Sequence, residues 1–145
     1  MKRFFYTTVI TFILFLSSCE LETSDNGKLD GFWHLERIDT LSTGGVKDLA
    51  ASRLFWSFQG KMMMVSDKDS RNAECILRFE NRGDSLLLYN PILSDRTHGD
   101  VVITDSSILN AYGINKVEER FRLEELSHSK MSLTNHKYRL FLRKF

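Results

Sequence analysis

From residue 31 onward, apolar and polar residues alternate with a period of two along much of the chain. That period is typical of β-strands with one buried and one exposed face. Glycines at Gly60 and Gly83 fall between alternating segments, where tight turns are expected. We therefore predict seven or eight short strands, in the segments 32–39, 54–59, 62–65, 75–80, 86–89, 121–124, 131–134 and 138–143.

Helical signals are few and short. Residues 105–109 are predicted to form one short helix capped by Asp105 or Ser106, and residues 47–53 have room for a single helical turn. Antiparallel hairpins in series close most naturally as an up-and-down barrel or a sandwich. We predict an all-β, antiparallel up-and-down β-barrel of about eight strands, with at most one short helix, because closure leaves no strand edge exposed.

The segment before this domain has the layout of a secretory signal. Lys2 and Arg3 precede an uncharged apolar run at residues 4–16, and the small residues Ser17 and Ser18 then lead to Cys19. A transmembrane anchor is one alternative, but it needs roughly 20 apolar residues, more than this run supplies. A plain signal peptide cut near Cys19 is the other alternative.

The run Leu16-Ser17-Ser18-Cys19 resembles the lipobox of bacterial lipoproteins. The resemblance implies removal of residues 1–18 and acylation of Cys19, with residues 19–30 as a polar tether and residues 31–145 as the domain. Each buried acyl CH₂ contributes about 0.8 kcal/mol, so two or three chains would hold the protein on a membrane. The expected location is the bacterial cell envelope, on the outer membrane rather than the inner.

Charge and cysteine content narrow the function classes. The formal charge is +1, and loss of the two basic residues Lys2 and Arg3 makes it −1, which gives no electrostatic case for nucleic acid as a partner. If Cys19 carries lipid, Cys75 has no partner within the chain, and we interpret it as a buried structural thiol rather than a reactive one. A disulfide between these two cysteines is the alternative if lipidation fails.

The sequence offers no catalytic arrangement. The four histidines, which have no metal-ligand spacing, are His34, His98, His128 and His136. Adjacent carboxylates such as Glu118 and Glu119 point to opposite faces of a strand, so they are expected to be solvated. We found no nucleophile elbow and no phosphate-binding loop. We therefore predict a protein that is not an enzyme, with no metal, no cofactor and no catalytic residue.

Gly31-Phe32-Trp33, at the start of the first predicted strand, resembles the Gly-x-Trp motif of lipocalins. In that family the Trp closes the base of the barrel and an Arg from the last strand packs over it, which implies barrel-base roles for Gly31, Trp33 and either Arg139 or Arg143. Thr104-Asp105 partly matches a second lipocalin motif. The segment Tyr112-Gly113-Ile114 and the terminal hairpin are also similar to lipocalin-like domains of small bacterial lipoproteins.

The resemblance implies a small apolar or amphipathic ligand in the barrel. The candidate lining residues lie on one predicted face: Trp56, Phe58, Met62, Met64, Leu77, Phe79, Leu86, Leu88, Phe121 and Leu123. Methionines favour an adaptable lining. The alternative is that the same side chains fill the barrel, in which case the protein is a structural or interaction protein with an envelope protein as its partner.

Overall fold

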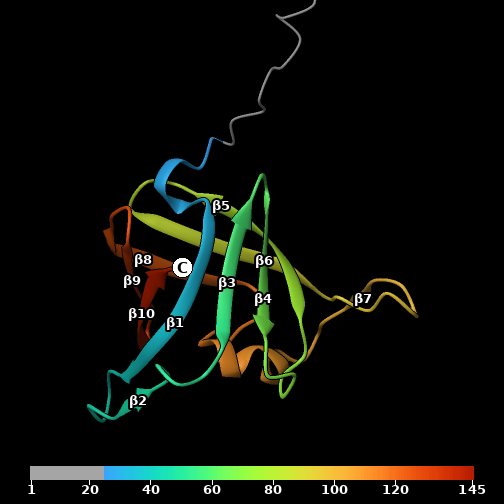
Figure 1. The fold of residues 1–145 in the computed structure, drawn as a ribbon, viewed down its shortest axis with the longest axis horizontal. Helices are drawn as coiled ribbons and strands as arrows, with labels where there is room; N and C mark the ends of the chain where they lie inside the picture. The colour runs from blue at the N-terminus through green and yellow to red at the C-terminus, as the bar shows by residue number, and fades with distance from the viewer. Residues whose placement is uncertain (1–24) are drawn as a thin grey trace, which may run out of the picture.

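The computed structural model describes residues 25–145, and its strands wrap into a closed antiparallel barrel (Figure 1). The predicted signal segment, residues 1–18, and Cys19 lie outside the described residues. The elements in chain order are η2 (Gly27–Leu29), β1 (Gly31–Thr40), β2 (Val46–Asp48), β3 (Leu54–Gln59), β4 (Met62–Asp67), β5 (Cys75–Asn81), β6 (Ser85–Leu93), β7 (Val101–Val102), η3 (Ser106–Tyr112), β8 (Glu119–Leu126), β9 (Lys130–Thr134) and β10 (Tyr138–Lys144).

Eight of these strands make the barrel, which confirms the predicted fold class. They pair in the order β1, β3, β4, β5, β6, β8, β9 and β10, and β10 pairs back onto β1 to close the sheet. The two short strands are not part of this ring of eight. Strand β2 pairs with the C-terminal half of β1, and β7 pairs with the C-terminal end of β6. Strands that neighbour each other in this ring also follow one another along the chain, which is the up-and-down topology expected from hairpins in series.

Two segments expected from the sequence differ in the structure. Residues 46–48 form strand β2, where a helical turn had room to form, because they pair with residues 37–39 of β1. The predicted short helix is present as η3, a 3-10 helix, and the Asp105 side chain accepts a hydrogen bond from the Ser107 amide at 2.9 Å. The expected turn at Gly83 is also present, with a positive φ of 85° that glycine adopts without strain.

The two ends of the barrel differ. At one end the strands are joined by short turns, at Gly60, at Gly83 and between β8 and β9, and η2 lies beside them (Figure 1). At the other end lie the connections that carry β2 and η3, whereas the hairpin with β7 projects from one side of the barrel (Figure 1). Neither helix in residues 25–145 has the length and apolar composition needed to cross a bilayer.

Candidate functional site

The interior of the barrel is the ligand site predicted from the sequence, and large side chains occupy it. Seven of the ten predicted lining residues are buried in the core: Trp56, Phe58, Leu77, Phe79, Leu86, Leu88 and Phe121. Leu123 is partly buried and packs against that core. The alternation on β3, β5, β6 and β8 therefore identified the inward face of each strand.

Four of these side chains are completely inaccessible to water. Trp56, Leu86, Leu88 and Phe121 have 0% of their surface accessible. A side chain bordering a void that admits a water molecule would keep some accessible surface, so these four border no such void. The rings of Trp56 and Phe121 meet edge to face with centroids 5.8 Å apart, a favourable aromatic arrangement. The centre of the barrel is thus filled by its own residues.

The η3 helix closes the end of the barrel that carries the long connections. Its residues Leu109 and Tyr112, with Ile114 just beyond, are fully buried. The Trp56 indole donates to the Tyr112 carbonyl at 3.2 Å, and the Tyr112 hydroxyl donates to the Ala73 carbonyl at 2.8 Å. Burial, with smaller contributions from nearby acidic groups, raises the pKa of Tyr112, so it stays a neutral donor. Hydrogen bonds with Trp56 on β3 and with Ala73 in the β4–β5 loop therefore hold η3 in this end of the barrel.

Trp33 closes the opposite end, as the lipocalin motif implied, but a different cation covers it. Trp33 is fully buried and its indole donates to the Leu29 carbonyl at 2.8 Å. The Lys144 ammonium lies 4.9 Å from the centre of the Trp33 ring and donates to the Lys28 carbonyl at 2.9 Å. Gly31 has φ +115°, and a Cβ there would lie 3.1 Å from Lys144 Cε, so this close approach favours glycine.

The prediction that Arg139 or Arg143 packs over Trp33 at the barrel base was wrong. Arg143 points outward and binds Glu36 at 2.6 Å, and Arg139 pairs with Glu124 at 2.9 Å. Leu140 and Leu142 face the core, so the residue of β10 that shares their face is Lys144, and the arginines at odd positions face outward. Alternation along the last strand was the signal that could have found Lys144.

Met62 and Met64 do not line the interior, which corrects the predicted register of β4. Met62 is 51% exposed, whereas Met63 is buried in the core. The two-residue turn at Gly60 and Lys61 sets Gln59 opposite Met62 and Phe58 opposite Met63. Directly paired residues share a face, so Met63 points inward with Phe58 and its two methionine neighbours point outward.

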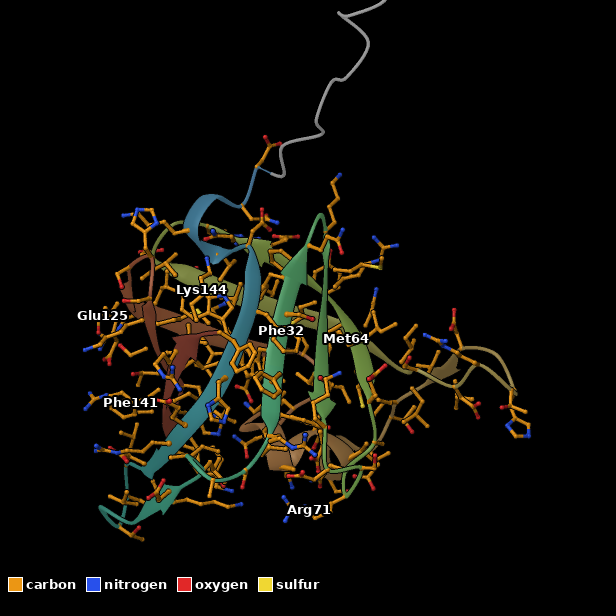
Figure 2. The ribbon with its side chains drawn as sticks, in the orientation of Figure 1. Phe32, Met64, Arg71, Glu125, Phe141 and Lys144 are labelled. Atoms are coloured by element: carbon orange, nitrogen blue, oxygen red, sulfur yellow. The ribbon has the colours of Figure 1, made fainter. Side chains whose placement is uncertain are left out.

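Met62 and Met64 line a hollow on the outside of the barrel, which we call the Met hollow. Figure 2 shows Met64 on the outer face of β4. The hollow has a volume of about 510 Å³ and is lined by Ser57, Gln59, Gly60, Lys61, Met62, Met63, Met64 and Ile76. This volume falls within the range of small-molecule sites.

The Met hollow belongs to a longer row of side chains, apolar except at Ser57, that crosses the outer face of the barrel. Register pairs link Phe32 to Ser57, Ser57 to Met64, Met64 to Ile76, Ile76 to Ile92 and Ile92 to Val102. At its β1 end, Phe145 donates its amide to the Phe32 carbonyl and packs its ring edge against Phe32. Phe145 is 79% exposed and Val102 is 67% exposed, so both ends of this outer row are open to solvent.

No three His, Cys, Asp or Glu side chains within residues 25–145 come together as a metal site requires. Cys75 is fully buried and is free of disulfide bonds within those residues. Burial, followed by the charge of Glu74, raises the pKa of its thiol to about 11, so it is protonated at neutral pH.

Comparison with known proteins agrees with this architecture. A family model described as "Lipocalin-like domain" matches residues 14–145. A lipocalin-like protein from Bacteroides uniformis superposes with a TM-score of 0.61 at 20% identity, over 82% of this chain and 100% of that chain. An uncharacterized protein from Bacteroides eggerthii gives a TM-score of 0.59 at 18% identity, over 81% of this chain and 99% of that chain.

No curated protein shows significant sequence similarity to the chain. The two solved structures are below 25% identity, so they support the fold and not a particular ligand. The family model spans most of the chain, including every strand of the barrel. The chain therefore belongs to the lipocalin-like domain family.

Proposed function

We propose that this protein is a lipid-anchored, non-enzymatic protein of the bacterial envelope whose barrel is a scaffold for binding on its outer surface. The observation that carries the proposal is the filled interior: Trp56, Leu86, Leu88 and Phe121 have no accessible surface. Anchoring through Cys19 stays the expectation from the lipobox resemblance. The partner we propose is another envelope protein.

The outer row supports this choice over a ligand inside the barrel. Scattered single apolar residues on a surface need no explanation, but contiguous ones mark interaction sites. Here Met64, Ile76 and Ile92 are linked rung by rung, and the Met hollow is the concave part of the row. Exposed methionines adapt their shape to a partner because the side chain is unbranched and polarizable.

A small apolar ligand held in the Met hollow is the second candidate. The volume of about 510 Å³ is the observation that favours it. Such a ligand would contact Met62, Met64 and Ile76 on the outside of the sheet, with Gln59 and Lys61 at the rim. This differs from the ligand site that the sequence suggested, which lay inside the barrel.

The first experiment distinguishes a binding site inside the barrel from one on its outer surface. A lipid-free chain starting at residue 20 contains the whole core, which runs from Leu29 to Leu142. It is titrated with an environment-sensitive apolar dye, alongside Met64→Asp. No saturable binding, or binding that Met64→Asp abolishes, agrees with an outer site. Saturable binding that survives Met64→Asp requires an interior cavity and would overturn the filled-barrel proposal.

The second experiment asks for the protein partner with the full chain in its envelope. A photo-crosslinking amino acid is placed at Met64 in the hollow and, as the matched control, at Phe141 on the outer face of β10 (Figure 2). We expect one adduct of defined mass at position 64 and none at position 141. The same adducts at both positions, or none at either, would contradict a partner at the Met hollow.

A further inference from the structure

Strand β7 belongs to a hairpin that projects from one side of the barrel (Figure 1). Strand β6 bends before this hairpin begins, because Asn90 has a φ of +50° and lies with Pro91 opposite the single residue Leu77 of β5. Two residues opposite one is a β-bulge, which bends the strand that carries the extra residue. The end of β6 and all of β7 therefore form an outward-pointing arm, which we define as residues 91–102.

The outer edge of β7 carries main-chain groups that are open to a further strand. Within residues 25–145, β7 pairs with β6 alone, and the Ile103 amide donates to the Pro91 carbonyl at 2.9 Å. Main-chain groups alternate in direction along a strand, so those of Val101 and Ile103 point toward β6. The amide and carbonyl of Val102 consequently point away from β6, toward the unpaired side.

The other short strand, β2, shows how an edge is protected from pairing. Among the described strands β2 pairs only with β1, and two of its residues are the charged Lys47 and Asp48. Charged side chains, lysine above all, keep an edge from accepting another strand. Strand β7 has no charge, and its two residues are exposed, Val101 by 45% and Val102 by 67%. An uncharged edge of β-branched residues favours addition of a strand.

A second copy of this chain fits the edge because β7 is complementary to itself. In an antiparallel pair with a two-fold axis at Val102, the Val102 residues of the two copies exchange both of their N–H···O bonds. Their β-branched side chains then face each other across the pair, which is a favourable arrangement. The same register sets the exposed Asp100 opposite Thr104 of the second copy, so a carboxylate meets a hydroxyl and no like charges are opposed.

We propose that the chain self-associates through β7, as a two-fold dimer in which the arms of two copies form one continuous sheet. The contact uses the main-chain edge of β7, which is separate from the Met hollow. Directly paired residues share a face, so the outer rows of the two copies meet end to end at Val102. Because the pairing edge is short, the dimer is weak and reversible.

Disulfide trapping in the full chain, in its own envelope, tests this register. Residues that exchange both hydrogen bonds have Cα atoms about 5.5 Å apart, a distance that a disulfide spans. The test variant is Val102→Cys. The matched control is Val46→Cys on β2, because Val46 is 61% exposed and also lies on a short edge strand. The buried Cys75 is common to both variants.

After mild oxidation, Val102→Cys should give a disulfide-linked species of twice the chain mass, about tenfold more than Val46→Cys gives by random collision. Equal trapping in the two variants, or none in either, would overturn the proposal. An adduct at position 102 with a protein of another mass would also overturn it, because the strand that pairs with β7 would then come from a different chain.

A proline variant tests the main-chain edge without an added thiol. Val102→Pro removes the outward amide and leaves the bonds to β6 in place. Val46→Pro is the control, because the Leu49 amide donates to Glu36 of β1 and the Val46 amide therefore points away from β1. In sedimentation of the detergent-extracted full chain, we expect Val102→Pro to weaken the dimer about tenfold or more and Val46→Pro to leave it unchanged.

Circular dichroism checks that both proline variants are folded. Sedimentation that does not change with concentration in the unmodified chain, or equal weakening by the two prolines, would contradict pairing through β7. These results are separable from the proposed function, which is tested by crosslinking at position 64. A dimer with no adduct at position 64 would leave self-association standing and remove the envelope partner, and an adduct with no dimer would do the reverse.

Discussion

Trp33→Ala should remove much of the stability of the domain. Truncating a fully buried Trp costs about 3–5 kcal/mol. The indole also donates to the Leu29 carbonyl, and an unpaired buried carbonyl costs about 1–3 kcal/mol. The contact with the Lys144 ammonium adds about 0.5–1 kcal/mol. These losses overlap, so we expect a decrease in the free energy of unfolding of about 4–6 kcal/mol, against about 5–15 kcal/mol for a typical domain.

The measurement is equilibrium urea unfolding of the lipid-free chain, followed by circular dichroism and by the fluorescence of the remaining Trp56. With a slope of about 1.5 kcal/mol per molar urea, the midpoint should fall by about 3–4 M. A midpoint within error of the unmodified protein would show that Trp33 does not close the barrel base, and the assignment of that role would fail.

A double-mutant cycle tests which cation covers Trp33. We expect Trp33→Leu and Lys144→Met to be coupled by about 0.5 kcal/mol or more, because the ammonium lies over the ring. The pair Trp33→Leu and Arg143→Met should be additive within about 0.3 kcal/mol, since Arg143 binds Glu36 instead. Coupling of Trp33 to Arg143 and none to Lys144 would show that Arg143, and not Lys144, covers the Trp33 ring.

Three further predictions concern single side chains. Burial alone would raise the pKa of Asp67, but hydrogen bonds from the Asp69 amide, the Asn72 side chain and the Arg71 amide hold it below its usual value. The stability it contributes is therefore present above about pH 4 and lost as pH falls through the folded pKa, and in Asp67→Asn the acid dependence measured by urea unfolding should weaken. Cys75 should react with a thiol reagent at pH 8 only after denaturant is added, because its pKa is about 11 and it is buried. Met63→Asp should unfold the domain while Met62→Asp leaves its melting temperature nearly unchanged, and the reverse order would refute the register of β4.

The strands of the barrel could be predicted because period-two alternation is a local property. Trp56 and Phe58 face inward and Ser57 and Gln59 face outward, as the pattern indicated. Strands β2 and β7 were missed because they have three and two residues, all exposed, and no alternation to read. Their pairing depends on where β1 and β6 lie in space, which a local pattern does not contain.

The candidate site was less predictable because its key facts concern pairing and packing. Three consecutive methionines give no alternation of their own, so the face of Met63 is fixed only by its partner Phe58 across the turn. The distinction between a filled and a hollow barrel depends on how Tyr112 and Leu109 pack against the strands. Lys144 lies directly opposite Trp33 only because the last strand pairs with the first.

Closure of the barrel between β1 and β10 has a consequence for folding. The pairs Trp33 with Lys144 and Thr40 with Tyr138 join the two ends of the domain. Long-range pairing of this kind slows folding to milliseconds or seconds, because the chain must form a large loop before the contact stabilises it. Until the last strand is made and arrives, β1 and β9 each keep an unpaired edge, which is a template for aggregation. A chain that loses its last eight residues would keep both edges permanently.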